Sequence, residues 1–334
     1  MSAFRSTMTA SGELDDQAAR LRELFRSRAG PAMQATACSA PIVAVTSGKG
    51  GVGKTNLAVN LATTLAERSR VSLVDADLGM ANADILCGVT PSMRLQDALP
   101  LFDGSVHGRV GAHPSAGPSL ASIGMPTPYG FVLVPGSVGV ARMADLHASE
   151  QRQLLRGLGT LEARSDLVLL DTGAGISPGV LGFLAVADLV LVVATPEPTS
   201  IADAYALIKC WAQRPPDDAA RDRGDRRSPR IALVVNQCRS RVEAESVHRR
   251  MLGACEKFLG LHLPLAGWVE RDARVADSVM ARTPVVRFAP TCSAASGINA
   301  LANVIRSEWM HADRGCSKST RFDALRRMWR MRSN

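Results

Sequence analysis

The sequence predicts a doubly wound α/β fold, in which helices flank a mostly parallel sheet. Three observations predict it. Short tracts rich in Val, Ile and Leu recur along the chain, segments with helical spacing separate them, and a glycine-rich motif joins the first tract to the first helix. With 334 residues, 46% of them apolar and 21% charged, the chain is long enough to bury a large core and is unlike disordered or fibrous sequences.

Tracts in which almost every residue is apolar are typical of strands that are buried on both faces of a parallel sheet. The sequence predicts six such strands, at residues 42–46, 71–74, 131–134, 167–170, 189–194 and 231–235. Helical spacing is found in five further segments, at residues 55–67, 140–161, 201–214, 241–259 and 295–310. Ser200 and Ser293 are expected to cap two of these helices, because serine side chains accept hydrogen bonds from amides of the first turn.

The chain is expected to have three parts. Residues 1–40 form a polar, amphipathic segment with a linker, residues 41–310 form the α/β domain, and residues 311–334 form a basic tail. Inside the domain, residues 103–129 are rich in Gly, Pro, Ser and His without periodicity, which indicates a mobile insertion. Residues 215–229 alternate Asp and Arg around prolines, which indicates a solvated loop.

Cysteine usage and hydropathy indicate a location inside the cell. The seven cysteines are an odd number at wide spacing, without a CxxC pair or a metal-ligand interval to histidine. The longest apolar run, residues 179–195, is interrupted by Asp188 and therefore indicates a helix end followed by a strand. The first residues lack the apolar stretch of a secretory signal, so we expect a cytoplasmic protein.

A phosphate-binding motif follows the first predicted strand and opens the first predicted helix. Glycines in such a loop let backbone amides converge on phosphate oxygens, and the helix N-terminus adds positive potential. Lys54 is expected to neutralise the terminal phosphates, and the Thr55 hydroxyl to ligate Mg²⁺. The residues expected to bind nucleotide here are Gly48, Lys49, Gly50, Gly51, Val52, Gly53, Lys54, Thr55 and Asn56.

Carboxylates follow two other predicted strands, at the end where an open α/β sheet binds its ligands. Asp75 and Asp77 come after the second strand, and the alternative for Asp77 is a role in capping or in a turn. Asp171 ends the fourth strand in the place of a Walker B aspartate, which reaches Mg²⁺ through water. Gly173 and Gly175 follow it in a loop that is able to reorganise around a γ-phosphate.

The run KGGVGKT at residues 49–55 resembles the deviant Walker A motif of the MinD/ParA class. A resemblance to the FlhG/FleN family of flagellar-number regulators, which are MinD-like ATPases, extends over four further runs, at residues 75–89, 134–146, 171–177 and 195–209. The resemblance covers residues 41 to about 310 and implies the fold of the SIMIBI-class P-loop NTPases. Relatives with a cluster-binding cysteine pair or a terminal tyrosine cluster do not fit, since the sequence has neither.

The resemblance implies that the cofactors are ATP and Mg²⁺ and that the protein is a slow, regulatory ATP hydrolase. It implies catalytic roles for Lys49, which crosses a dimer interface to the partner's nucleotide, and for Asp77, which positions or activates the attacking water, beside Lys54. Asn236, after the sixth strand, matches the family asparagine that reads the adenine amino group, although asparagine is also a common turn former. The expected metal ligands are Thr55, Asp75 and Asp171.

The run DQAARLR at residues 16–22 resembles an N-terminal element of this family that engages the GTPase FlhF and stimulates its GTP hydrolysis. The residues expected to make this contact are Asp16, Gln17, Leu21 and Arg22. The alternative is an amphipathic helix that packs on the protein's own core. The sequence leaves open whether flagellar C-ring proteins or a flagellar transcription activator also bind, and whether the flagella are polar or peritrichous.

Most of the formal net charge of +8 lies in residues 311–334. On a helical wheel, the apolar side chains of this tail share one half and its arginines share the other, which indicates a helix in an anionic membrane interface. The residues expected to insert are Phe322, Leu325, Met328 and Trp329. The alternative is a helix docked on the protein itself or on its dimer partner.

These features, with the resemblance, predict an ATP-dependent switch that controls flagellar number and placement. We expect ATP to close a homodimer, the dimer to hold its tail on the inner face of the cell membrane, at a cell pole, and hydrolysis to release it. The alternative is a ParA-type partition or positioning ATPase that binds DNA without sequence preference and with a steep salt dependence. Binding to a specific nucleic-acid sequence is not expected.

Overall fold

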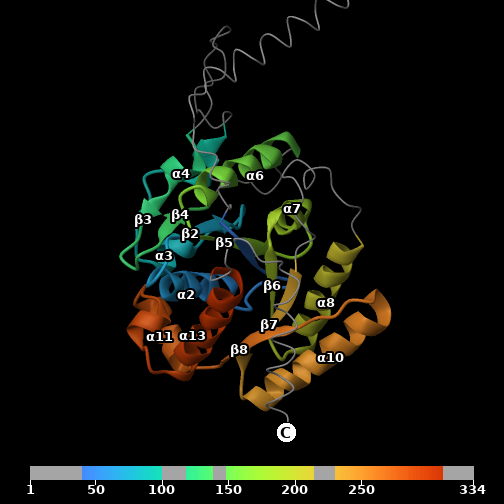
Figure 1. Ribbon diagram of the computed structural model, residues 1–334. Helices are drawn as coiled ribbons and strands as arrows, with labels where there is room; N and C mark the ends of the chain where they lie inside the picture. Colours follow the sequence, from blue (N-terminus) through green and yellow to red (C-terminus); the bar gives the residue numbers. More distant parts are fainter. Residues whose placement is uncertain (1–39, 100–117, 138–147, 214–229, 311–334) are drawn as a thin grey trace, which may run out of the picture. The chain divides into compact units, whose positions relative to one another are not determined.

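Eight strands form one sheet in the order β3-β4-β2-β5-β1-β6-β7-β8 (Figure 1). All neighbouring strands are parallel except β3 and β4, which pair antiparallel at one edge. This computed structural model describes residues 40–99, 118–137, 148–213 and 230–310. The strands are β1 (Ile42–Ser47), β2 (Val71–Ala76), β3 (Met125–Pro126), β4 (Val132–Val134), β5 (Leu167–Ala174), β6 (Leu189–Ala194), β7 (Arg230–Cys238) and β8 (Leu265–Glu270).

The central strands are buried on both faces, which explains their continuous apolar sequences. In β1, Ile42 and Ala44 belong to the core on one side of the sheet, while Val43 and Val45 belong to the core on the other side. This alternation is the two-residue period of a strand. Every residue of β1 is buried between β5 and β6.

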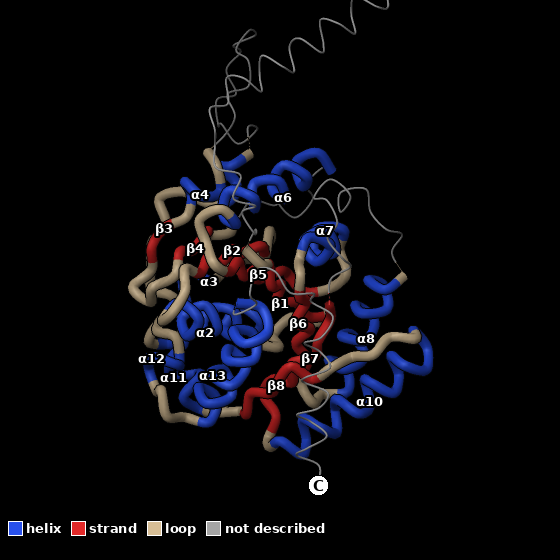
Figure 2. The backbone as a smooth tube through the Cα atoms, in the orientation of Figure 1, coloured by secondary structure: helices blue, strands red, loops and turns tan. Residues whose placement is uncertain are grey.

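Helices cover both faces of the sheet (Figure 2). One layer consists of α4 (Leu120–Ile123), α6 (Ala148–Glu162), α7 (Pro178–Val186), α8 (Pro198–Ala212) and α10 (Arg241–Leu259). The opposite layer consists of α2 (Lys54–Ala66), α3 (Ala83–Leu86), α11 (Ala273–Met280), α12 (Val285–Phe288) and α13 (Ser293–Ile305). Two further short helical segments are η1 (Leu95–Ala98) and η3 (Arg306–Met310). The predicted doubly wound α/β fold is therefore confirmed.

All six predicted strands are present, but the two predicted serine caps are wrong. Ser200 lies inside α8, which begins two residues earlier at Pro198, because proline suits the first helical position. Its hydroxyl instead accepts a hydrogen bond from the amide of Thr195 at 2.9 Å. Ser293 is already helical, and the N-cap of α13 is Cys292, whose sulfur accepts from the amide of Ala295.

The prediction of a mobile insertion over residues 103–129 is wrong for its described part. Residues 118–129 contain α4 and β3, and they are fixed because Leu120 and Ile123 enter the core. The Thr127 amide and hydroxyl both donate to the carbonyl of Phe131, at 2.9 and 2.8 Å. The rest of the insertion, residues 103–117, and the predicted 215–229 loop lie outside the described residues.

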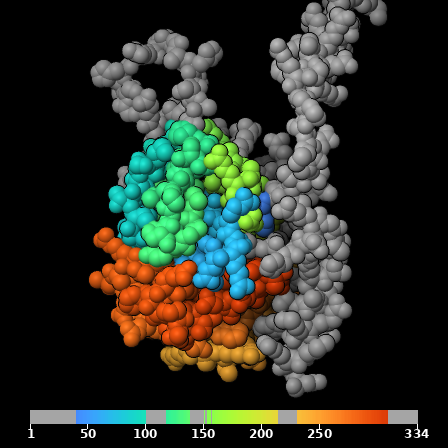
Figure 3. Space-filling model, turned by 60° about the vertical axis from the view of Figure 1, so that its left-hand side comes forward, coloured from blue at the N-terminus to red at the C-terminus, as the bar shows by residue number. Residues whose placement is uncertain are grey.

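The segment after α3 and the turn between β3 and β4 both lie against the turn between α11 and α12. The Tyr129 hydroxyl donates to the Arg282 carbonyl at 3.4 Å, and a Cβ at Gly88 would lie 3.2 Å from the same oxygen. In Figure 3 the cyan and green segments accordingly rest on the orange segment formed by α11 to α13.

The long apolar run is divided as predicted. Helix α7 ends at Val186, β6 begins at Leu189, and Asp188 lies between them. The Asp188 Oδ2 atom accepts a hydrogen bond from the Ile42 amide at 2.8 Å, which ties this turn to the start of β1. Among the helices of the described residues, none is long and apolar enough to cross a bilayer.

Candidate nucleotide site

The glycine-rich loop connects the end of β1 to the start of α2. Gly53 is the N-cap of α2 and has a left-handed backbone (φ +88°), which glycine adopts without strain. A Cβ at Gly48 would lie 2.1 Å from the carbonyl group of Asp203 in α8, so only glycine permits this close approach. The loop therefore reaches the N-terminus of α2, where backbone amides and the helix dipole favour an anion.

Asp75 and Asp171 are register partners in the carboxyl-terminal halves of the neighbouring strands β2 and β5. Asp75 is buried and accepts three backbone hydrogen bonds. Its Oδ2 atom accepts from the amides of Asn82 and Ala83, both at 3.0 Å, and its Oδ1 atom accepts from the amide of Asp77 at 3.3 Å. The structure thus brings together two of the three predicted metal ligands.

Asp171 is fully buried, and within the described part of the chain neither of its carboxylate oxygens has a hydrogen-bond partner. Burial, and then the neighbouring Asp75, raise the pKa of Asp171 well above its ordinary value, while the nearby Thr55 hydroxyl and Lys54 ammonium group act in the opposite direction. Burial also raises the pKa of Asp75 to about 6, against the lowering effect of its amide hydrogen bonds. Adjacent buried carboxylates of this kind suit a cation.

The described residues offer a cation two carboxylates rather than a complete set of protein ligands. Over the described ranges, no three or more His, Cys, Asp and Glu side chains gather as a metal site. Mg²⁺ bound to phosphates keeps several waters and takes only one or two carboxylates from the protein. The pair formed by Asp75 and Asp171, next to Thr55, therefore fits Mg²⁺ in the company of a nucleotide.

Asp77 lies near both Asp75 and Gly173, which belongs to the last residues of β5. Its Oδ1 atom accepts hydrogen bonds from the amides of Gly79 at 3.2 Å and Met80 at 3.1 Å, so it closes a turn, as the alternative interpretation expects. A Cβ at Gly173 would lie 3.5 Å from the same oxygen. The carboxylate is therefore both a turn-forming group and a neighbour of the predicted switch loop.

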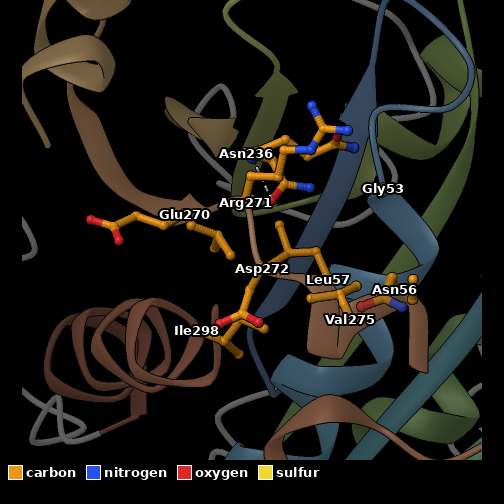
Figure 4. A pocket seen from close by; sticks show the side chains of 12 residues that line it. Gly53, Asn56, Leu57, Asn236, Glu270, Arg271, Asp272, Val275 and Ile298 are labelled. Atoms are coloured by element: carbon orange, nitrogen blue, oxygen red, sulfur yellow. Dashed lines mark hydrogen bonds between the residues drawn. The ribbon is translucent and has the colours of Figure 1, made fainter. Parts of the chain in front are cut away.

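A pocket of about 320 Å³ opens beside the glycine-rich loop and is lined by the ends of β7 and β8 and by residues of α2, α11 and α13 (Figure 4). Asn236 lies in its wall. The Asn236 Nδ2 atom donates to the Val52 carbonyl at 2.7 Å, and its Oδ1 atom accepts from the Gln237 amide at 3.0 Å. Asn236 therefore holds the loop in place in addition to lining a pocket of a size suited to a small ligand group.

Comparison with known families decides the class of protein. The CobQ/CobB/MinD/ParA nucleotide binding domain matches residues 43–285. The chain belongs to this MinD/ParA family. Its predicted resemblance to the FlhG/FleN branch of the family is confirmed by two flagellar relatives, FleN and YlxH.

Two flagellar proteins are similar over most of their length. Antiactivator FleN of Pseudomonas aeruginosa is 34% identical over 267 residues, which are 80% of this chain and 86% of FleN. Flagellum site-determining protein YlxH of Helicobacter pylori is 27% identical over 298 residues, 88% of this chain and 92% of YlxH. MinD of Pyrococcus horikoshii OT3, described as complexed with Mg-ADP, shares the fold with a TM-score of 0.60 at 20% identity, over 80% of this chain and 96% of that one.

In this MinD/ParA-family chain, Lys49, the first of the two P-loop lysines, contacts residues of its own chain. The Lys49 Nζ atom lies 3.2 Å from Glu197 Oε2 and 3.1 Å from Thr199 Oγ1, at the start of α8. The Ser47 hydroxyl donates to the Lys49 carbonyl at 2.6 Å and fixes the backbone there. The Lys49 side chain is 40% exposed and the Glu197 side chain is 66% exposed, so water screens the attraction between them.

The part of the pocket formed by β8 and α11 is not anticipated by the sequence. Asp272 fixes this part, since its Oδ2 atom accepts from the amide and hydroxyl of Ser293 at 3.0 and 2.9 Å and its Oδ1 atom accepts from the Arg274 amide at 2.9 Å. The available signal is the charged run ERDAR at residues 270–274, which directly follows a short and only partly apolar tract. The unpredicted pocket residues include Glu270, Arg271, Asp272, Val275 and Ile298.

Two predicted interaction segments lie outside the described residues. One contains the residues expected to contact a GTPase, Asp16, Gln17, Leu21 and Arg22. The other contains the residues expected to enter a membrane, Phe322, Leu325, Met328 and Trp329. Both stay predictions from the sequence.

Proposed function

We propose that this chain is an ATP-hydrolysing molecular switch that controls flagellar number and placement. The observation that carries the proposal is Asp171, a buried carboxylate without a hydrogen-bond partner in the described structure, beside Lys54 and Thr55 at the P-loop. Such a group needs a cation, and the adjoining helix N-terminus needs an anion. A magnesium nucleotide supplies both, and the related MinD described as complexed with Mg-ADP supports this choice.

Each predicted site residue has a task that its position supports. The P-loop amides hold the phosphates, and Lys54 neutralises their terminal charge. Thr55, Asp75 and Asp171 hold the metal, which when bound supplies charge neutralisation at the β- and γ-phosphates. Asp77 orients the attacking water, since phosphoryl transfer depends on positioning more than on a strong base. The pocket next to Asn236 takes the adenine.

ATP binding closes a homodimer in this proposal, and Lys49 carries the signal between the subunits. Lys49 leaves Glu197 and Thr199 and reaches the nucleotide bound by the partner. Its considerable exposure supports this movement, because little buried structure has to be disrupted. Hydrolysis then reopens the dimer, so the enzyme activity sets the lifetime of a state.

The flagellar role rests on the two relatives whose names describe an antiactivator and a flagellum site-determining protein. In the proposed cycle the dimer holds its C-terminal tail on the inner face of the cell membrane at a cell pole, and the 16–22 segment stimulates the GTPase FlhF. Candidates for further partners are flagellar C-ring proteins and a flagellar transcription activator. Counting flagella in a deletion strain tests the biological role directly, and an unchanged number would refute it.

The biochemical test is ATP turnover with and without Mg²⁺. We expect slow hydrolysis that requires Mg²⁺ and that is lost in Asp171→Asn, whereas equal turnover without Mg²⁺ would contradict the site assignment. Sedimentation with DNA and with anionic vesicles, each over a range of salt concentrations, separates the proposal from a ParA-type function. ATP-dependent binding to DNA but not to vesicles would favour the ParA-type alternative.

A further inference from the structure

An arginine next to the proposed nucleotide site joins two backbone segments that enclose Asp75. Arg94 comes directly before η1, and its guanidinium makes two contacts. Its Nη2 atom donates to Asp84 Oδ2 at 2.6 Å, and its Nη1 atom donates to the carbonyl of Gly136 at 3.1 Å. Only 24% of the Arg94 side chain and 6% of the Asp84 side chain are exposed, so this ion pair is largely shielded from water.

The first enclosing segment carries the amides that hold Asp75. Asn82 and Ala83 both donate to the Asp75 Oδ2 atom at 3.0 Å, and Asp84 is the next residue of the chain. Helix α3 has only four residues, and so short a helix has little stability of its own. The ion pair with Arg94 therefore fixes the place of the two donating amides.

The second enclosing segment lies against the other side of Asp75. A Cβ at Gly136 would lie 3.1 Å from Asp75 Cγ and 2.6 Å from the Asp75 carbonyl oxygen, so the two residues are in direct contact. The Leu95 amide donates to the Pro135 carbonyl at 2.8 Å and holds η1 on the same segment. Arg94 thus connects the α3 segment to the segment after β4, with Asp75 between them.

We infer that Arg94 and Asp84 are positioning residues that hold the Asp75 carboxylate in its working orientation. The inference rests on the proposed role of Asp75 in the network of Mg²⁺ and water. Arginine suits this task because its planar guanidinium donates hydrogen bonds to two acceptors at a fixed angle, whereas the ammonium group of lysine is a compact point charge. Loss of such support around a metal ligand typically reduces metal affinity or activity by about 10- to 100-fold.

The test compares Arg94→Gln and Arg94→Lys with the unaltered protein. ATP hydrolysis is measured against Mg²⁺ concentration, and ATP binding is measured separately in EDTA. For Arg94→Gln we expect the half-maximal Mg²⁺ concentration to rise, or kcat to fall, by about tenfold or more. ATP binding in EDTA should change by less than about threefold, because the P-loop contacts are untouched. Arg94→Lys should recover part of the loss through its charge opposite Asp84.

The matched control is Arg70→Gln. Arg70 also forms an ion pair with an aspartate, at 2.7 Å from Asp166 Oδ1, but it precedes β2 and is far along that strand from Asp75. Arg70→Gln should leave the Mg²⁺ dependence unchanged.

Several results would overturn the inference. The first is that Arg94→Gln leaves both the Mg²⁺ dependence and kcat unchanged. The second is that Arg70→Gln changes them as much as Arg94→Gln does. The third is that Arg94→Gln loses ATP binding in EDTA as strongly as it loses hydrolysis, which would indicate a general structural defect. Absence of hydrolysis by the unaltered protein would instead overturn the proposed function on which the inference rests. The two failures are therefore distinguishable.

Discussion

The Lys49 Nζ atom lies 3.2 Å from Glu197 Oε2, so the P-loop lysine that we propose acts across a dimer interface is bound within its own chain. Thr199 supplies a second acceptor at 3.1 Å. An exposed ion pair of this kind contributes about 0.2 to 1 kcal/mol. This amount is small compared with the binding energy of a nucleotide, so release of Lys49 is within the reach of ATP binding.

Lys49→Ala and Lys54→Ala should separate dimerisation from nucleotide binding. Lys54 lies at the start of α2, near Asp171, and its loss should abolish ATP binding because its proposed role is to neutralise the phosphates. Lys49→Ala should keep most of the ATP affinity but fail to dimerise and to hydrolyse ATP. Light scattering with ATP and Mg²⁺ measures the dimer, and a fluorescent ATP analogue measures binding. A monomer under these conditions for the unaltered protein at micromolar concentration would contradict the proposal.

Glu197→Gln should favour the dimer by removing the charge that holds Lys49 on its own subunit. Each of the two subunits gives up one such pair when the dimer closes. If a pair contributes up to about 1 kcal/mol, the ATP-dependent dimerisation constant therefore rises by at most about 30-fold. Analytical ultracentrifugation over a concentration series resolves such a change. The control is Glu245→Gln, which removes the exposed ion pair of Glu245 with Arg241 at 2.7 Å on α10 and should change nothing. A weaker dimer in Glu197→Gln would show that Glu197 helps to place Lys49 across the interface.

Asp75 should make the nucleotide-free protein less stable as pH rises. Burial raises its pKa from 3.8 to about 6, so the folded state binds this proton more tightly than the unfolded state. The resulting stabilisation is complete below about pH 4 and is lost as the pH rises to about 6. Denaturant titrations should show that the free energy of unfolding falls more steeply over this window in the unaltered protein than in Asp75→Asn. Identical slopes would mean that Asp75 does not bind the proton in the folded state.

Asn236→Ala should weaken ATP binding in two ways. It removes the 2.7 Å hydrogen bond that holds the Val52 carbonyl of the P-loop, and it removes the proposed contact with the adenine amino group. Loss of a hydrogen bond typically costs about 0.5 to 1.5 kcal/mol, so two losses predict roughly a tenfold or larger fall in ATP affinity. GTP affinity should fall less, because guanine has no amino group at that position. Equal falls for both nucleotides would leave only the loop-holding role.

Local sequence patterns predict where the P-loop and the two buried carboxylates lie. The P-loop is continuous in sequence, and Asp171 comes directly after an apolar tract. The prediction that the strand ends at Asp171 is wrong, because β5 continues to Ala174 and Asp171 lies inside it. The pairing of Asp75 with Asp171 follows from parallel strands whose carboxyl ends meet at one edge of a sheet. The partner of Lys49 has no such signal, since Glu197 is 148 residues away in sequence.

The part of the pocket formed by β8 and α11 could not be predicted, because β8 has a weak sequence pattern. Strand β8 reads LAGWVE, with a glycine and a glutamate among six residues, so it is less apolar than the central strands. Helix α13 packs closely against β8 at Gly267, where an added Cβ would lie 3.5 Å from the Leu301 side chain. Such a glycine is explained only once the packed helix is known. The same holds for Asp272, which depends on its contacts with Ser293.

The membrane prediction concerns the tail at residues 311–334 and follows from its sequence. A single short amphipathic helix inserts only three or four large apolar side chains, each worth about 1.5 to 3 kcal/mol before ordering costs. Binding by a monomer should therefore be weak and reversible. Two tails joined in an ATP-bound dimer raise the avidity by roughly 10² to 10⁴ without any new contact.

Trp329→Glu, or deletion of residues 319–334, should accordingly abolish sedimentation with anionic vesicles and leave ATP binding intact. The decisive comparison is sedimentation in ADP and in ATP, because avidity requires the dimer while the apolar area of each tail is the same in both states. Lys49→Ala provides the matched control, since it should bind ATP, keep an unaltered tail and still sediment only as weakly as the ADP form. Equal binding in ADP and ATP would refute the coupling between nucleotide and membrane. Sedimentation that survives the deletion would show that the tail is a packing helix.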